Sequence, residues 1–186
     1  MSDSISANIK NKISEDLSPT RNITGFHLKV VSAIAIIWSL FQLWYASPFP
    51  FMLNIGMFKG LPARAIHLGF ALTLAFLIYP VAKGKKISFF DIIISFVGAF
   101  SCLYIYFFYD QLVERGGVLL SLKITDTFNF PVELILGGCG ILILLEATRR
   151  AIGLPLVIIA TCFLLFSYFG RYAPEIISHG GLSLNR

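Results

Sequence analysis

Long apolar runs, broken by short polar segments, follow a polar N-terminal segment of 26 residues. Soluble helices keep a polar face at a spacing of about 3.6 residues. In contrast, residues 33–40, 96–100 and 134–145 are apolar or small all the way round a helix. A helix that crosses a bilayer needs about 17–25 residues. The pattern therefore predicts five transmembrane helices, at residues 27–47, 62–82, 89–109, 131–147 and 152–169.

The predicted fold is an all-α, polytopic integral membrane protein. We expect residues 1–26 to form a flexible or amphipathic cytoplasmic segment, residues 27–172 the transmembrane helical domain, and residues 173–186 a periplasmic C-terminal tail. The runs lack the in–out alternation over about ten residues that marks a membrane β-barrel. No signal peptide is expected, because no apolar core precedes a cleavage site in the first segment.

Composition supports the membrane assignment. The 186 residues are 56% hydrophobic and 13% charged, with a mean hydropathy of +0.79. Soluble domains are about 45–50% apolar and about 25% charged. So few charged residues cannot cover the surface of a soluble globule of this size.

The positive charges are distributed unevenly between the two predicted sides of the membrane. With the N-terminus taken as cytoplasmic, nine of the 15 Lys and Arg residues lie on the inner side, including clusters at residues 83–86 and 149–150. Cytoplasmic loops carry such an excess, so five spans would place the C-terminus in the periplasm. The net charge of +5 therefore reports membrane topology. No basic stripe of the kind that binds nucleic acid is seen.

Ionisable residues in or near the spans are the first functional candidates, because burying them in a membrane is costly. Arg64 and His67 lie three residues apart near the outer end of the second run and share a helical face. They could contact a partner or an anionic lipid headgroup, but snorkelling to the interface is the simpler interpretation.

Small and weakly polar side chains form a stripe along the third span. Asp91, Ser95 and Gly98 follow one another at spacings of four and three, which predicts a helix–helix packing seam. Asp91 also suits a first turn, where the helix dipole favours an acid. In the fourth run, Gly137 and Gly140 would let another helix approach closely.

The polar stretch between the last two runs holds Glu146, Arg149 and Arg150. Glu146 and Arg150 form a favourable i, i+4 pair, and the arginines suit both a helix C-terminus and anionic lipid. Gly153 and Pro155 follow, as expected where one helix ends and another begins. We interpret the stretch as a short cytoplasmic turn whose charges meet lipid or a partner.

The sequence contains no nucleophile–base pair, metal-ligand spacing or phosphate-binding glycine loop, so we expect no catalytic residue, metal or cofactor. A small membrane enzyme or lipid-interacting protein is the alternative, and it would need polar groups that converge at one interface. A complete small transporter is a further alternative. It would need a polar site at mid-membrane.

Several short motifs follow one another in a distinctive order. They are Arg-Ala-Ile-His-Leu-Gly-Phe-Ala at 64–71, Leu-Glu-Ala-Thr-Arg-Arg at 145–150, Phe-Gly at 169–170 and His-Gly-Gly-Leu-Ser at 179–183. From about residue 27 to the end, this order resembles the N-terminal region of the membrane permeases of tripartite ATP-independent periplasmic (TRAP) transporters. The likeness is greatest to fused permeases of the TAXI type.

The resemblance implies a small Q-type membrane subunit that acts as a fixed scaffold in the bacterial inner membrane. In that family a large M-type subunit carries the substrate and a coupling cation, Na⁺ or H⁺. A periplasmic TAXI-type binding protein delivers the substrate, an organic acid such as a dicarboxylate. The expected partners are therefore the large subunit, the binding protein and anionic lipids. Because the chain stops at Arg186, where the large domain of a fused permease would begin, we expect a separate subunit or one piece of a longer permease.

Topology can be tested with single cysteines in a variant that lacks Cys102, Cys139 and Cys162. In intact cells, Lys85→Cys should be protected from membrane-impermeant thiol reagents and Lys123→Cys should react, because the charge bias places them on opposite sides. Both should react once the cells are permeabilised. Labelling of Lys85→Cys but not Lys123→Cys in intact cells would reverse the orientation.

Overall fold

The computed structural model describes residues 20–81, 87–116, 122–125, 128–130, 132–172, 174, 177–178 and 180. Helices dominate this part of the chain, as the sequence predicts. In chain order the elements are α2 (Gly25–Ala46), α3 (Phe49–Leu53), α4 (Gly60–Ile78), α5 (Phe89–Glu114), β1 (Leu122–Thr125), β2 (Phe128–Phe130), α6 (Val132–Ala151), α7 (Leu154–Phe169) and the 3₁₀ helix η1 (Gly170–Tyr172). Most of the predicted terminal segments, and Lys85 of the topology test, lie outside these residues.

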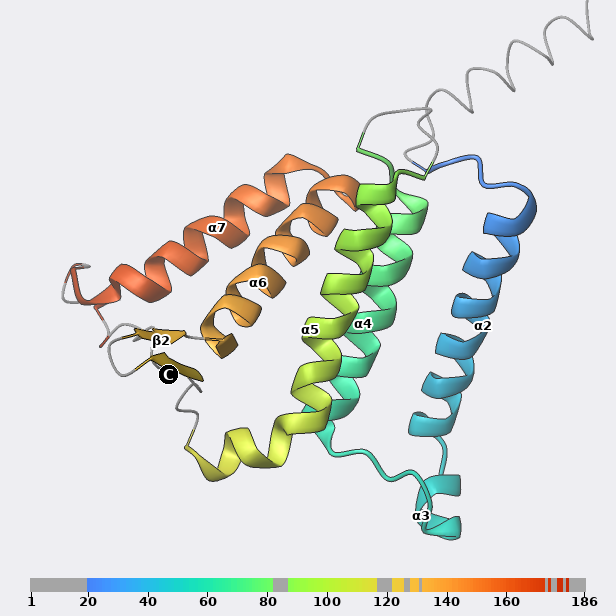
Figure 1. The fold of residues 1–186 in the computed structure, drawn as a ribbon, viewed down its shortest axis with the longest axis horizontal. Coiled ribbons are helices and arrows are strands. Elements are labelled where there is room, and N and C mark those ends of the chain that lie inside the picture. The colour runs from blue at the N-terminus through green and yellow to red at the C-terminus, as the bar shows by residue number, and fades with distance from the viewer. Residues whose placement is uncertain are drawn as a thin grey trace, which may run out of the picture.

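The long helices fan out from one end of the molecule (Figure 1). α4 and α5 pack along each other most extensively, α2 lies against α4, and α6 lies against α5. α7 packs on α6 after a short turn in which Gly153 has a φ of +112°. The end where α4 stops and α5 starts also receives the C-terminal end of α6, so three long helices are connected there.

The core lies between α4, α5 and α6. Leu72, Phe76, Cys102 and Ala147 form one buried cluster, with Ile143 packed against it. The largest of these side chains, Phe76, is fully buried. These contacts hold the central helices together, while α2 and α7 lie outside the cluster.

Small side chains on one face of α5 bring its neighbours close. The buried residues of α5 are Asp91, Ser95, Gly98, Ser101 and Cys102. A Cβ atom at Gly98 would lie 3.0 Å from Ile143 Cγ2 and 3.4 Å from Leu72 Cδ1, so Gly98 lies in the contact with both α4 and α6. Gly137 differs, because a Cβ there would meet no atom within 4 Å, and a Cβ at Gly140 would meet only Ser101 at 3.7 Å.

Four helices are long and apolar enough to cross a membrane. They are α2, α4, α5, and α7 together with η1. Within the described chain α2 buries only Val31 and α7 buries no residue, although both are rich in large apolar side chains. Monomeric soluble proteins rarely expose apolar patches of this extent. By their length, composition and uncovered apolar surface, these helices have the character of transmembrane helices.

The remaining predicted span, at 131–147, is a helix of different character. α6 has 20 residues and continues to Ala151, so its last turn contains both Arg149 and Arg150. Its length is about 30 Å at 1.5 Å per residue. Because Glu133 and Glu146 add two acids, α6 is more highly charged than the four apolar helices. A fifth crossing stays a prediction.

The two segments between the predicted spans at 48–61 and 110–130, which the apolar pattern leaves as loops, contain regular structure. α5 continues past the predicted end at 109 to Glu114, and β1 pairs with β2 in an antiparallel hairpin inside the predicted loop 110–130. The predicted loop 48–61 contains α3, which ends at Asn54 in the left-handed conformation. Elements this short give a weak sequence signal, which is why the apolar pattern did not indicate them.

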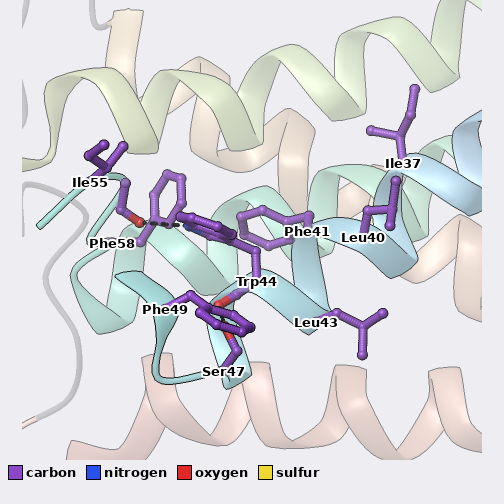
Figure 2. Close-up of a pocket in the computed structure, with 10 residues that line it drawn as sticks. Ile37, Leu40, Phe41, Leu43, Trp44, Ser47, Phe49, Ile55 and Phe58 are labelled. Atoms are coloured by element: carbon purple, nitrogen blue, oxygen red, sulfur yellow. Dashed lines mark hydrogen bonds between the residues drawn. The ribbon is translucent and has the colours of Figure 1, made fainter. Parts of the chain in front are cut away.

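α3 and residues 55–58 pack their apolar side chains against the C-terminal end of α2 (Figure 2). Trp44 Nε1 donates a long hydrogen bond of 3.4 Å to Gly56 O, and Gly56 has a φ of +63°. A cavity of about 760 Å³ lies here, lined almost entirely by apolar side chains such as Phe49.

Nearby, Lys59 Nζ donates a hydrogen bond to Asp110 Oδ1, and this bond raises the pKa of Lys59. Aromatic and basic side chains together are typical of a membrane–water boundary.

Replacing Gly98 with Val should weaken the packing of α5 against α4 and α6, because even a Cβ is crowded at this position. Overpacking of this kind costs about 1–3 kcal/mol. Thermal unfolding of the detergent-solubilised protein, followed by its helical circular dichroism, should show a lower Tm. Gly138→Val is the matched control, since a Cβ there meets no atom within 4 Å. Equal Tm values for the two variants would contradict this packing role.

Candidate functional site

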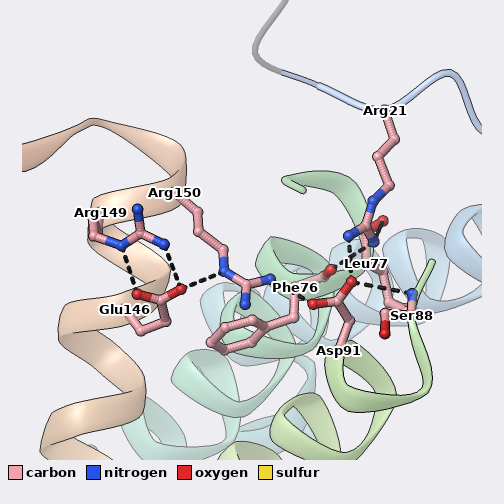
Figure 3. Close-up of polar contacts among 8 residues, drawn as sticks. All are labelled: Arg21, Phe76, Leu77, Ser88, Asp91, Glu146, Arg149 and Arg150. Atoms are coloured by element: carbon pink, nitrogen blue, oxygen red, sulfur yellow. Dashed lines mark hydrogen bonds and ion pairs between the residues drawn. The ribbon is translucent and has the colours of Figure 1, made fainter. Parts of the chain in front are cut away.

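Five charged side chains meet where α4 ends, α5 begins and α6 ends (Figure 3). They are Arg21, Asp91, Glu146, Arg149 and Arg150, and we call them the arginine–carboxylate network. The sequence favours these positions, because Asp91 is in the first turn of α5 and two of the arginines are in the last turn of α6. Helix dipoles stabilise acids and bases at these respective ends.

Asp91 is the centre of the network. Its Oδ1 accepts a hydrogen bond of 2.7 Å from Arg150 Nη1, and its Oδ2 accepts one from Arg21 Nη2. The backbone N–H of Ser88 donates to the same Oδ2 at 3.2 Å. The side chains of Asp91, Arg21 and Arg150 are only 3–4% exposed. Carboxylates this deeply buried occur where they are paired, and here two cations from distant parts of the chain provide the pairing.

Arg21 joins the segment before α2 to the end of α4. Its backbone N–H donates to Ile78 O at 2.9 Å, and its Nη1 donates to Phe76 O at 3.0 Å and Leu77 O at 3.2 Å. The last carbonyls of a helix lack partners within that helix. Arg21 therefore caps α4 as well as neutralising Asp91. Arg21 belongs to the predicted cytoplasmic segment 1–26. Most of that segment lies outside the described residues, so its flexible or amphipathic character stays a prediction.

Glu146 links the two arginines of α6. Arg149 Nε and Nη2 donate to its two carboxylate oxygens at 2.7 and 2.8 Å, and Arg150 Nε donates to Oε1 at 2.8 Å. The i, i+4 pair that the sequence predicts is therefore formed. Arg150 also lies over the Phe76 ring, 4.8 Å from its centroid. Arg150 forms ion pairs with both Glu146 on α6 and Asp91 on α5, so it links the two carboxylates.

The network contains three arginines and two carboxylates, so it carries a net charge of +1. Its hydrogen bonds are mostly internal, and Arg149 is its most exposed member, with 37% of the side chain accessible. A catalytic site would present polar groups to a cavity where a substrate could sit. This arrangement suits a structural clamp, with Arg149 placed to meet an anionic headgroup.

A second buried pair ties the far end of α5 to the start of α6. Glu133 is 5% exposed and accepts hydrogen bonds from Tyr104 Oη at 2.8 Å and from Arg115 Nη2 at 2.7 Å. The hydrogen bond to Glu133 raises the pKa of Arg115 above its usual value. Beside this pair, a mainly apolar cavity of about 380 Å³ lies between α4, α5 and α6, with Gly137 and Gly140 in its lining.

A small polar patch interrupts the apolar surface between α2 and α4. Trp38 Nε1 donates to His67 Nδ1 at 3.3 Å, and Gln42 Nε2 lies 2.7 Å from the same nitrogen. The two rings of Trp38 and His67 meet edge to face, with centroids 5.0 Å apart. His67, Gln42 and the nearby Arg64 are all exposed. The four residues Trp38, Gln42, Arg64 and His67 are called the polar patch below.

The structure distributes the predicted site residues among four places. Asp91 joins Glu146, Arg149 and Arg150 in the network, Ser95 and Gly98 lie in the packing face of α5, Gly137 and Gly140 line the smaller cavity, and Arg64 and His67 belong to the polar patch.

The contacts of Arg21 and Trp38 were not predicted from the sequence. Arg21 is 70 residues from Asp91 and Trp38 is 29 residues from His67, so no local pattern indicates either contact. The available signal was that Arg21 and Asp91 flank apolar runs on the same predicted side of the membrane.

Among the residues that the structure describes, no group of three or more His, Cys, Asp or Glu side chains could hold a metal ion. Comparisons of the chain with protein-family models, curated proteins and solved structures found no match. Function is therefore inferred from the sequence motifs and from the geometry described above.

Replacing Asp91 with Asn should destabilise the protein strongly, because Arg21 and Arg150 would keep buried positive charges without their shared counter-ion. Removing one partner of a buried ion pair costs about 3–5 kcal/mol. Glu146→Gln should cost about 0.5–1 kcal/mol, because the Glu146 side chain is 30% exposed. Thermal unfolding in detergent measures both changes.

Asp110→Asn is the control for this comparison, because it removes an ion pair whose side chains are 62% and 70% exposed. Its Tm should stay close to that of the wild type. A greater loss of Tm for Glu146→Gln than for Asp91→Asn would contradict the central role of Asp91.

Proposed function

We propose that this chain is the small, Q-type membrane subunit of a TRAP transporter and serves as a fixed scaffold for the large M-type subunit. The large subunit carries the organic acid, such as a dicarboxylate, together with the coupling cation, Na⁺ or H⁺. A periplasmic TAXI-type binding protein delivers the acid. The scaffold lies in the bacterial inner membrane, with its N-terminus in the cytoplasm, and binds no substrate itself.

The arginine–carboxylate network is the observation that carries this proposal. Substrate and ion sites in secondary transporters are built from polar groups near mid-membrane, typically on broken helices. Among the described residues the deeply buried charges lie near helix ends and are paired. Asp91 pairs with Arg21 and Arg150 at one end, and Glu133 pairs with Arg115 at the other. Their ion pairs link α5 to α6, and the hydrogen bonds of Arg21 to Phe76 O and Leu77 O add α4, which suits a subunit that stays still while its partner moves.

Two cavities formed by the described residues support the same function. Both are lined mainly by apolar side chains. A site for an organic anion would need several convergent polar or cationic groups to replace its hydration. Such linings fit lipid chains or a packed helix better than a carboxylate substrate.

The exposed helices provide surface for a large membrane partner. α2 and α7 lie on opposite flanks of the helix array (Figure 1), and both leave most of their apolar side chains uncovered. Lipid can cover such faces, and so can the helices of another subunit. We place the large subunit against one flank and lipid against the other.

Reconstitution tests whether the chain transports anything alone. Liposomes that contain only this chain should take up no radiolabelled dicarboxylate above empty vesicles, even with a Na⁺ or H⁺ gradient and the TAXI-type binding protein present. The physical reason is that the two cavities among the described residues are lined mainly by apolar side chains and offer no cationic group for an organic anion. The one carboxylate in their linings, Glu133, is already paired with Arg115. Adding the large subunit should produce uptake. Saturable, gradient-driven uptake by this chain alone would refute the scaffold function.

A further inference from the structure

The polar patch lies well inside the length of its helices. His67 is the eighth residue of the 19-residue helix α4, about 10 Å from the helix start at 1.5 Å per residue. Trp38 precedes Ala46, the last residue of α2, by eight residues, which is about 12 Å. Polar side chains that face lipid tails at such depths are costly, and they are usually turned towards another helix.

The contacts within the patch fix the direction in which His67 can bind. The indole of Trp38 has a donor and no acceptor, so His67 Nδ1 accepts its hydrogen bond at 3.3 Å. Gln42 Nε2 reaches the same nitrogen at 2.7 Å. In the neutral imidazole the proton is then on Nε2. His67 thus offers an N–H donor on the edge of its ring that Trp38 and Gln42 do not occupy.

Arg64 adds donors to the same face. It precedes His67 by three residues, so the two side chains are neighbours on α4. A guanidinium has five N–H donors and no acceptor. Arg64 takes part in none of the ion pairs formed by the described residues. The exposed side of the patch therefore presents a positive charge and N–H donors, which an acidic group would complement.

We propose that the polar patch docks a transmembrane helix of the large partner subunit, with an Asp or Glu of that helix accepting hydrogen bonds from Arg64 and from His67 Nε2. The identity of this partner rests on the proposed function. Gln42 is an exposed residue beside His67, and its amide oxygen can accept a hydrogen bond from the same helix.

A partner helix explains the whole patch better than a lipid headgroup does. A headgroup at the membrane surface can reach Arg64 by snorkelling. It would have to enter the hydrocarbon region to reach His67, about 10 Å along the helix. α2 contacts only α4 and α3 to any extent within the described chain, so a helix could lie beside it along most of its length.

Photo-crosslinking in cells that also make the large subunit tests this docking face. Tyr45 follows Trp38 by seven residues, which places it on the same side of α2, and it is 44% exposed. With p-benzoylphenylalanine at Tyr45, the expected product is an adduct with the large subunit, mapped by mass spectrometry to a helix that carries an acidic residue. Phe163 on α7, which is 67% exposed on the opposite flank, is the matched control and should give lipid adducts.

A double variant tests the chemistry of the contact. His67→Phe keeps a ring beside Trp38 and removes the Nε2 donor, and Arg64→Gln removes the charge. Together they should lower the amount of large subunit that co-purifies by about tenfold, equivalent to about 1.4 kcal/mol. The Tm of this chain alone should change little, because both side chains are exposed. Replacing the mapped acidic residue of the large subunit with Ala should have the same effect and add nothing to the double variant.

The outcomes separate this inference from the scaffold proposal. If the wild-type chain co-purifies with the large subunit, but Tyr45 gives only lipid adducts or the double variant assembles fully, the docking face is wrong and the scaffold stands. An adduct between two copies of this chain would also overturn the docking face. If the wild-type chain does not associate with the large subunit at all, both proposals fail.

Discussion

A buried carboxylate between helix ends must be neutralised, and in this chain that requirement determines how the helices meet. Asp91 begins α5, Arg150 ends α6, and Arg21 precedes α2 while it caps α4. One acid therefore connects four parts of the chain. Burying these three charges costs free energy, which their ion pairs offset. A variant without Asp91 would leave Arg21 and Arg150 buried with no shared counter-ion and would lose that stabilisation. The position of each helix end follows from this shared contact.

The network also accounts for the splayed arrangement of the helices. Ion pairs join α5 and α6 at one end, where Arg21 also hydrogen-bonds the last carbonyls of α4, and small residues such as Gly98 let the three helices approach one another. Towards the other end, α5 and α6 are joined through the Arg115–Glu133 pair, which leaves an apolar cavity between them and α4. Apolar surface on both flanks then faces lipid or a partner. Central helices that are paired at both ends, with uncovered flanks, suit the proposed scaffold better than a moving transport domain.

Sequence patterns predicted the helices because a membrane span must be apolar over a fixed length. The helix ends were less predictable, since charged residues such as Glu114 and Arg150 can continue a helix beyond its apolar run. Local spacing likewise indicated the pair of Glu146 with Arg150. The contacts of Asp91 join residues 59 and 70 positions apart, so they depend on how the helices pack, which no local spacing encodes. The same holds for the polar patch. The spacing of Arg64 and His67 on α4 could be recognised in the sequence, whereas their neighbours Trp38 and Gln42 on α2 could not.

The two polar regions lie at different depths, and this difference bears on how a scaffold would work. With the predicted cytoplasmic N-terminus, the network lies at the inner surface, where Arg149 can meet anionic lipid. The polar patch then lies in the outer half of the membrane, nearer to α3 and the apolar side chains around it. An inner clamp would fix the orientation of α4, and α4 carries the donors of Arg64 and His67. In a transporter of the proposed kind, a change in the ion pairs of the network would therefore alter the angle at which α4 presents these donors to a partner helix, at a distance from any substrate site.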